Sequence, residues 1–177
     1  MARKKAYEEK IVKLVLIKEG IYDLEEDLII KCPISIHGAG QTNTIIQGKG
    51  IRIEGTKEEK KRVNMQGMSS SGATYGLVAR NGLSFLCKDM TFTQCGWSGV
   101  YAKNTKGRLI NCVITQFYYS GIWCGENALI ELEGKKTKVH GNVRRGSSDI
   151  YGLYACDTSS TIHLLFPLTK ESVSTNP

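Results

Sequence analysis

The chain has 177 residues, 41% of them apolar, which fits one domain with a buried core and excludes a disordered composition. Its 19 glycines and 3 prolines favour short strands and tight turns over a helical bundle. The 24 basic and 17 acidic residues give a net charge of +7, which favours anionic partners such as nucleic acid, acidic glycan or a phosphorylated surface.

The N-terminal segment has a basic start but is not expected to be a signal peptide. Lys13 and Lys18 leave too short an uncharged apolar run, and no stretch approaches the ~20 apolar residues that a membrane helix needs. The six cysteines form no CxxC pair, so reduced core thiols are expected, with one or two disulfides as the alternative. These features favour an intracellular or virion-associated protein without a metal, a cofactor or a membrane partner.

Helical periodicity is poor along most of the chain. Residues 1–20 are predicted to form an N-terminal cap, and the pattern from Ile11 onward is typical of β-structure. Short alternating runs such as PISIHG, IRIEG and TFTQC are separated by Gly, Asn and Ser. The sequence therefore predicts many short strands.

A repeat in the second half of the chain is the strongest signal. Four segments align without gaps: YGLVARN from Tyr75, SGVYAKN from Ser98, SGIWCGE from Ser120 and YGLYACD from Tyr151. Their glycines are spaced 23, 22 and 31 residues apart. Such a period predicts stacked coils of roughly 22 residues in a single domain spanning residues 1–177, with a loop insertion at about 134–149.

The columns of this alignment alternate as residues of a strand do. Two columns are expected to form buried ladders: Leu77, Val100, Ile122 and Leu153, and then Ala79, Ala102, Cys124 and Ala155. A polar column is expected where each coil turns: Asn81, Asn104, Glu126 and Asp157, with Asn127 as the alternative if the third coil has an extra residue. The sequence thus predicts an all-β parallel solenoid.

The opening segment carries a second pattern, in which a strand leads to Gly-x-Tyr, an apolar strand, an I-x-G-x-G turn and a T-x-I-x-G strand. Its residues are Gly20, Tyr22, Ile36, Gly38, Gly40, Thr44, Ile46 and Gly48. Together with the repeat, residues 11 to 166 resemble the right-handed parallel β-helix proteins of the pectin-lyase-like class. That resemblance implies a single-stranded right-handed parallel β-helix. It leaves the activity open, because the class includes lyases, hydrolases, epimerases, phage tailspikes and non-enzymatic modules.

The outward columns lack the carboxylates that hydrolases of this class use. They contain Val78, Tyr101, Trp123 and Tyr154, followed by Arg80, Lys103, Gly125 and Cys156. The segment around Asp157 also lacks the Pro and His of the epimerase pattern. No catalytic residue is therefore predicted. A polysaccharide lyase remains the alternative, with Tyr101 or Tyr154 as the acid–base residue and Arg80, Lys103 or Arg144 neutralising a uronate carboxylate.

A binding surface has more support than a catalytic site. Tyr101, Trp123 and Tyr154 are expected side by side on successive coils, and a second outward column contains Thr74, Trp97, Tyr119 and Ile150. Clustered exposed aromatic side chains mark interaction sites and offer stacking surfaces to sugar rings. The alternative is that a loop, a chain end or a neighbouring subunit covers them.

The insertion before Gly152 places Arg144 and Arg145 where they are expected to overhang these rings, and arginine suits carboxylate, sulfate or phosphate. The predicted binding residues are Tyr101, Trp123, Tyr154, Trp97, Tyr119, Arg80, Lys103, Arg144 and Arg145. The expected function is a non-catalytic module that binds an anionic polysaccharide, or a structural protein of an assembly such as a virion. The partner at the aromatic face is a polysaccharide or a protein, a homo-oligomer is compatible, and no nucleic-acid module is present.

Overall fold

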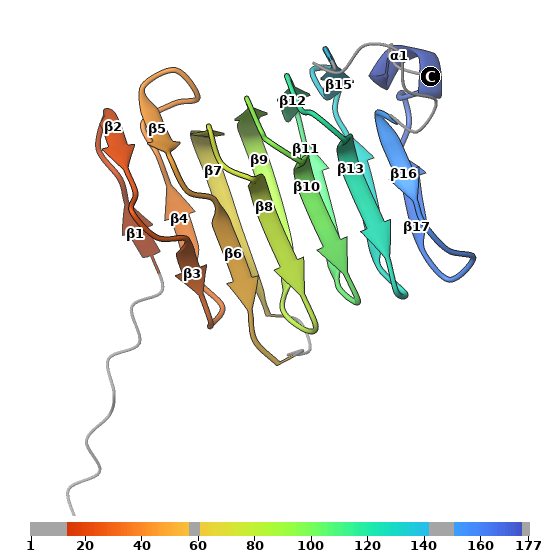
Figure 1. Cartoon of the computed structure of the whole chain (residues 1–177), viewed down its shortest axis with the longest axis horizontal. Helices are drawn as coiled ribbons and strands as arrows, with labels where there is room; N and C mark the ends of the chain where they lie inside the picture. Colours follow the sequence, from red (N-terminus) through yellow and green to blue (C-terminus); the bar gives the residue numbers. More distant parts are fainter. Residues whose placement is uncertain (1–13, 57–60, 142–150, 175–177) are drawn as a thin grey trace, which may run out of the picture.

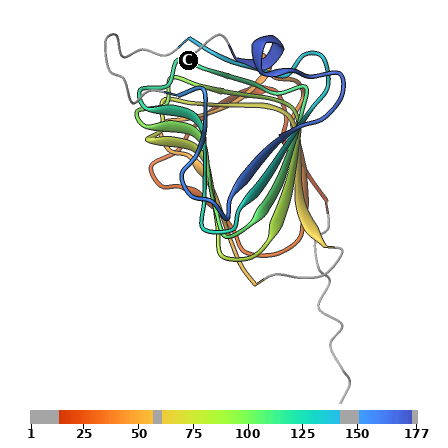
Figure 2. The same cartoon turned by 90° about the vertical axis from the view of Figure 1, so that its right-hand side faces the viewer.

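The strands form a parallel β-solenoid of about five turns (Figure 1), which confirms the all-β solenoid that the sequence predicts. The computed structural model describes residues 14–56, 61–141 and 151–174. Within these ranges every strand pairing is parallel, and the single short helix is α1 (Lys170–Val173). Each coil of the solenoid is one circuit of the chain around a common interior, and Figure 2 shows the coils superimposed in that direction.

One side of the solenoid is a six-stranded sheet, called the front sheet here, whose strands lie nearest the viewer in Figure 1. In spatial order it consists of β3 (Leu28–Ile30), β6 (Ile51–Glu54), β8 (Tyr75–Arg80), β10 (Ser98–Lys103), β13 (Ser120–Gly125) and β16 (Leu153–Ala155). Its outward surface is called the front face. It contains all four repeated segments found in the sequence.

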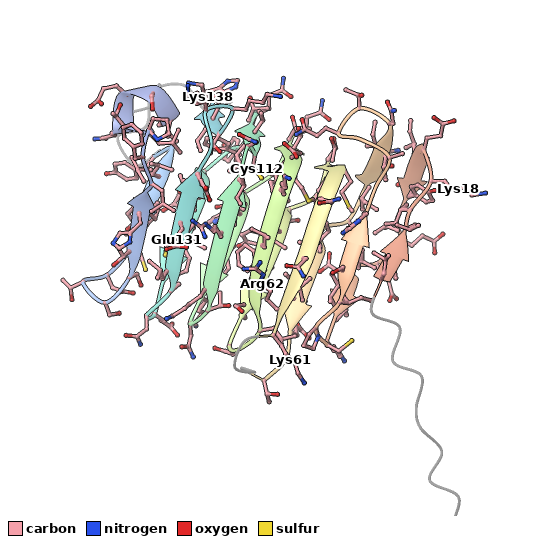
Figure 3. The ribbon with its side chains drawn as sticks, turned by 180° about the vertical axis from the view of Figure 1, so that it is seen from behind. Lys18, Lys61, Arg62, Cys112, Glu131 and Lys138 are labelled. Atoms are coloured by element: carbon pink, nitrogen blue, oxygen red, sulfur yellow. The ribbon has the colours of Figure 1, made fainter. Side chains whose placement is uncertain are left out.

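The other two sides belong to one larger sheet, because the long strands β7 and β9 contribute to both sides. The back side, seen in Figure 3, runs through β1 (Leu14–Leu16), β4 (Ser35–His37), β7 (Arg62–Ser71), β9 (Ser84–Thr93), β11 (Lys106–Ile110), β14 (Leu129–Glu133) and β17 (Thr161–Leu164). The third side adds β2 (Gly20–Asp23), β5 (Thr44–Gln47), β12 (Val113–Thr115) and β15 (Lys138–His140) to the ends of β7 and β9.

The two predicted ladders have the predicted register. Val100 pairs with Leu77 and Ile122, Ala102 pairs with Ala79 and Cys124, and all six side chains are fully buried. The prediction is wrong only in the last coil, where Leu153 is half-buried and Ala155 is exposed. Both residues keep their register with β13, but among the described residues no further coil stacks upon them.

The predicted polar column forms the turns that end the front strands. Asn81, Asn104 and Glu126 have φ angles of 50°, 48° and 50°, in the left-handed region that asparagine tolerates better than most residues. Asn127 follows with φ 62°, so the third coil has two successive left-handed residues. Asp157 acts differently, because its carboxylate accepts a hydrogen bond from the Glu126 N–H at 2.7 Å.

The ends of the solenoid differ from each other. At the N-terminal end β1 already pairs with β4, so residues 14–20, which the sequence assigned to a cap, belong to the first coil. At the other end α1 lies beside β15, where Val173 is buried and Ser174 bridges to Val139. Of the predicted insertion, residues 134–141 are described and residues 142–150, with Arg144 and Arg145, lie outside the described ranges.

All six cysteines are free thiols, which agrees with the predicted absence of disulfides. The prediction that they are core thiols holds for four of them, whereas Cys32 and Cys156 are exposed. Burial raises the pKa of the Cys95 and Cys112 thiols to about 12 and that of Cys124 to about 11. A buried thiol with such a pKa carries almost no thiolate near neutral pH.

We therefore expect two classes of thiol in a titration. Under native conditions at pH 8, a thiol reagent should modify Cys32 and Cys156 first, and Cys156 more slowly than Cys32, because partial burial and its hydrogen bond to Asp157 raise the pKa of Cys156. The remaining four should react only on the timescale of unfolding, and denaturant should bring the total to six. A total below six in denaturant without reductant would show that disulfides form.

Candidate functional site

The front face carries two pairs of stacked aromatic rings. Tyr101 on β10 and Trp123 on β13 are paired in register, and their ring centroids are 4.3 Å apart at an interplanar angle of 3°. Trp97 and Tyr119, each just before one of these strands, stack at 4.9 Å and 20°. The sequence correctly predicts that these residues are neighbours. Because the rings stack along the solenoid axis, much of the surface that they leave to solvent consists of ring edges.

Tyr101 is covered from both neighbouring coils. The Arg80 guanidinium carbon lies 5.0 Å from the centroid of the Tyr101 ring, while Trp123 reaches the ring from the following coil. Tyr75 meets the Tyr101 ring edge-on, at 5.4 Å and 64°. The ring of Tyr101 is therefore a structural centre of the surface, and its faces are already occupied by protein groups.

The Trp123 ring extends along its own strand and lies over Gly125. A Cβ atom added at Gly125 would collide with the Cη2 atom of the Trp123 ring and with the Cys156 sulfur. This contact explains why a glycine occupies a column that contains Arg80 and Lys103 in the preceding coils. Tyr154 pairs with Trp123 in register, but its ring stacks on Tyr151 at 5.2 Å and 10°. The aromatic surface thus contains separate stacks.

Acidic side chains accompany the predicted cations. Lys103 Nζ lies 2.7 Å from Glu126 Oε1, and this hydrogen bond raises the pKa of Lys103. Glu54 on β6 pairs in register with Arg80. Arg80 and Lys103 are predicted from the sequence to bind an anion, and the structure adds a carboxylate beside each of them. Within the described residues, the front face therefore presents aromatic surface with mixed charge.

Charged side chains on the back side form contacts of their own. Arg108 on β11 lies 2.9 Å from Glu133 and 3.7 Å from Glu131, both on β14. Figure 3 shows Glu131 on this side, in the middle of its strand. Such exposed pairs contribute little to stability. Among the described residues, the paired aromatic rings all lie on the strands of the front sheet or just before them. The stacked aromatic rings therefore distinguish the front face from the back side.

A hollow that the sequence analysis missed adjoins Tyr75. It has a volume of about 270 Å³, and its lining consists of Asp27, Lys49, Gly50, Ile51, Arg52, Thr74, Tyr75 and Val78. Arg52 donates to Asp27 Oδ2 through Nε at 3.0 Å and Nη2 at 2.5 Å, while the Gly50 N–H donates to Asp27 Oδ1 at 3.2 Å. Lys49 and Thr74 are exposed beside this ion pair. We call this feature the front hollow.

The titration of Asp27 follows from these contacts. Burial by itself raises the pKa of Asp27, but hydrogen bonds from Arg52 and from the Gly50 N–H outweigh burial, so the pKa is lowered. Burial also raises the pKa of Tyr75, with a further contribution from Tyr101. Tyr75 therefore remains a protonated hydrogen-bond donor near neutral pH.

Replacing Asp27 with asparagine should remove a pH-dependent contribution to stability. Because the folded-state pKa is below the unfolded value of ~3.9, the contribution is complete above about pH 4 and disappears as the pH falls through the folded-state pKa. Asp27→Asn should lower the free energy of unfolding by about 1 kcal/mol at pH 7 and by much less at pH 2. Denaturant titrations at both pH values test this, with the exposed Glu25→Gln as control. An equal loss at both values would contradict the assignment.

The described residues contain no group of three or more His, Cys, Asp or Glu side chains that is suited to a metal ion. Within the same ranges, none of the helical structure is long and apolar enough to cross a membrane. The fold places the chain in the class of parallel β-solenoid proteins, with an aromatic surface on one side. Comparisons with protein-family models, curated proteins and solved structures gave no match.

Proposed function

We propose that this chain is a non-catalytic β-helix module of the pectin-lyase-like kind that binds an extended acidic polysaccharide along its front face. The observation that carries the proposal is a pair of aromatic stacks, each of which joins two successive coils: Tyr101 with Trp123, and Trp97 with Tyr119. Trp97, just before β10, is 44% exposed, so an indole ring is available for contact with a sugar.

The geometry favours a polymer over a small molecule. Coils of a parallel sheet repeat every ~4.8 Å, so the aromatic surface extends along the solenoid as an elongated polymer does. The net charge of +7 favours an acidic polymer through long-range attraction. Since Lys103 is paired with Glu126, the charge close to the rings contributes less than the sequence suggested.

Titration of the protein with acidic and neutral oligosaccharides of equal length tests the proposal. Acidic oligosaccharides should bind more tightly, and their affinity should fall with added salt because exposed charges are screened. No unsaturated product should accumulate during a long incubation. Product release would favour the lyase alternative, with Tyr101 or Tyr154 as its acid–base residue, and a failure to bind any acidic glycan would overturn the proposal.

A structural role is the second candidate, and the first coil supports it. Leu14, Leu16, Ile21 and Ile29 are 50%, 71%, 65% and 49% exposed, and all four lie on β1, β2 or β3. Within the described residues these strands pair on one side only. Exposed apolar side chains on an open sheet edge suit association with a protein partner or a second copy of the chain. Sedimentation of the wild type and of Leu16→Lys tests this, and self-association that the substitution leaves unchanged would contradict it.

A further inference from the structure

We propose that the front hollow binds one residue of the acidic glycan, a hexuronate at the end of the bound segment. This inference rests on the proposed function and adds a defined site for one sugar ring to it. The hollow lies beside Tyr75, whose ring meets Tyr101 edge-on, so it continues the aromatic surface toward the N-terminal coils.

The hollow exists because one coil has smaller side chains than the next coil at two matching positions. In the two aromatic columns, the coil of β8 has Thr74 and Val78, whereas the coil of β10 has Trp97 and Tyr101. In the column between them the order is reversed, since Tyr75 pairs with the small Ser98. The two small side chains leave space above the sheet, and the Tyr75 ring forms a wall of that space.

The lining provides what a hexuronate requires. Lys49 supplies positive charge for a carboxylate. The charge of Arg52 is already balanced by Asp27 and by Glu54 at 3.7 Å, and the Asp27 carboxylate supplies acceptor oxygens for sugar hydroxyl groups. The hydroxyl groups of Thr74 and Tyr75 add further donors, and the Tyr75 ring offers an apolar surface. The Asp27–Arg52 ion pair holds both side chains in place before a ligand binds, which reduces the entropy cost of binding.

The size of the hollow limits the ligand to about one ring. Pockets for drug-sized ligands measure roughly 300–1,000 Å³, and the front hollow, at about 270 Å³, lies just below that range. It opens beside the start of β8, and Tyr75, which lines it, contacts Tyr101 of the neighbouring stack. A chain that crosses the aromatic stacks can therefore place its end residue in the hollow.

The sharpest test of the hollow as a binding site is to fill it with a large side chain at Thr74, the position that Trp97 occupies in the next coil. Thr74→Trp introduces the side chain that Trp97 already places in this column, so it should fold normally. Sodium glucuronate, glucose and an oligosaccharide of six hexuronate residues serve as ligands in calorimetric titrations. Glucuronate should bind with a dissociation constant in the millimolar range and glucose more weakly. Thr74→Trp should lower glucuronate affinity at least tenfold, and Lys49→Ala about three- to fivefold.

The controls separate this site from the aromatic stacks. Thr158→Trp, at an exposed position in the turn after β16, should leave all three affinities unchanged, and Trp123→Ala should leave glucuronate binding unchanged while weakening the hexamer. If Trp123→Ala weakens the hexamer but Thr74→Trp and Lys49→Ala alter neither ligand, the hollow is not a subsite and the proposed function stands. If glucuronate binds as expected and the hexamer does not bind, the extended surface is excluded and the hollow stands. Binding of neither ligand overturns both.

Discussion

Replacing Phe92 with alanine is expected to lower the free energy of unfolding by about 3–5 kcal/mol, because the substitution leaves a cavity in a close-packed interior. Phe92 is fully buried near the C-terminal end of β9, the strand that links the back side to the third side. A Cβ atom added at Gly76 would lie 3.0 Å from Phe92 Cδ1, so the ring packs closely against the backbone of β8. The melting temperature should fall by about 10 °C.

Phe166→Ala is the matched control, since Phe166 is 95% exposed and its truncation should change stability by less than about 0.5 kcal/mol. If Phe92→Ala does not fold, Phe92→Leu should still unfold cooperatively with a loss of about 1.5 kcal/mol or less. Chemical denaturation measures all three variants. Equal effects of Phe92→Ala and Phe166→Ala would show that the interior is not packed as described here.

The sequence predicts the fold well because a solenoid repeats one local rule. Alternation along each strand places Val100 and Ala102 inside, and the 22–23-residue period places their partners from the adjacent coils beside them. The turn residues are also readable, since asparagine tolerates the positive φ found at Asn81 and Asn104. The rule fails at Ala155 because, among the described residues, no further coil covers β16, and an alignment of columns does not show where the stack ends.

The site is only partly predictable from the same columns. They identify Tyr101 and Trp123 as neighbours, but the position of the indole depends on Gly125, which has no side chain in the space that the Trp123 ring occupies. Tyr154 keeps its register and still turns toward Tyr151, which a column cannot reveal. Charge is harder to predict, because the pairing of Lys103 with Glu126 depends on the geometry of a turn.

The front hollow was missed for a related reason. Repeated columns indicate what successive coils share, whereas the hollow lies where the columns change from Trp97 and Tyr101 to Thr74 and Val78. Its ion pair joins Asp27 and Arg52 from a part of the chain outside the four aligned segments. In a solenoid, a position where one coil has a much smaller side chain than its neighbours is therefore a candidate for a binding site.

Truncating Trp123 should weaken binding of an acidic oligosaccharide about five- to tenfold, the change that a loss of ~1–1.4 kcal/mol produces. Stacking of one aromatic ring contributes about 0.5–1.5 kcal/mol, and Trp123 is half-buried, with one ring face on Tyr101. Its removal also loses that internal stack, so the free energy of unfolding should fall by no more than about 1.5 kcal/mol.

The dissociation constant of an acidic hexasaccharide for wild type and Trp123→Ala, measured beside the melting temperatures of both, tests the proposed binding surface most directly. A five- to tenfold weaker affinity with a melting temperature within about 5 °C of wild type is the expected result. Phe166→Ala should bind as the wild type does, because Phe166 follows β17 of the back side and belongs to neither aromatic stack of the front face. A large loss of stability in Trp123→Ala with unchanged affinity would show that Trp123 supports the fold and that the front face does not bind glycans through its aromatic stacks.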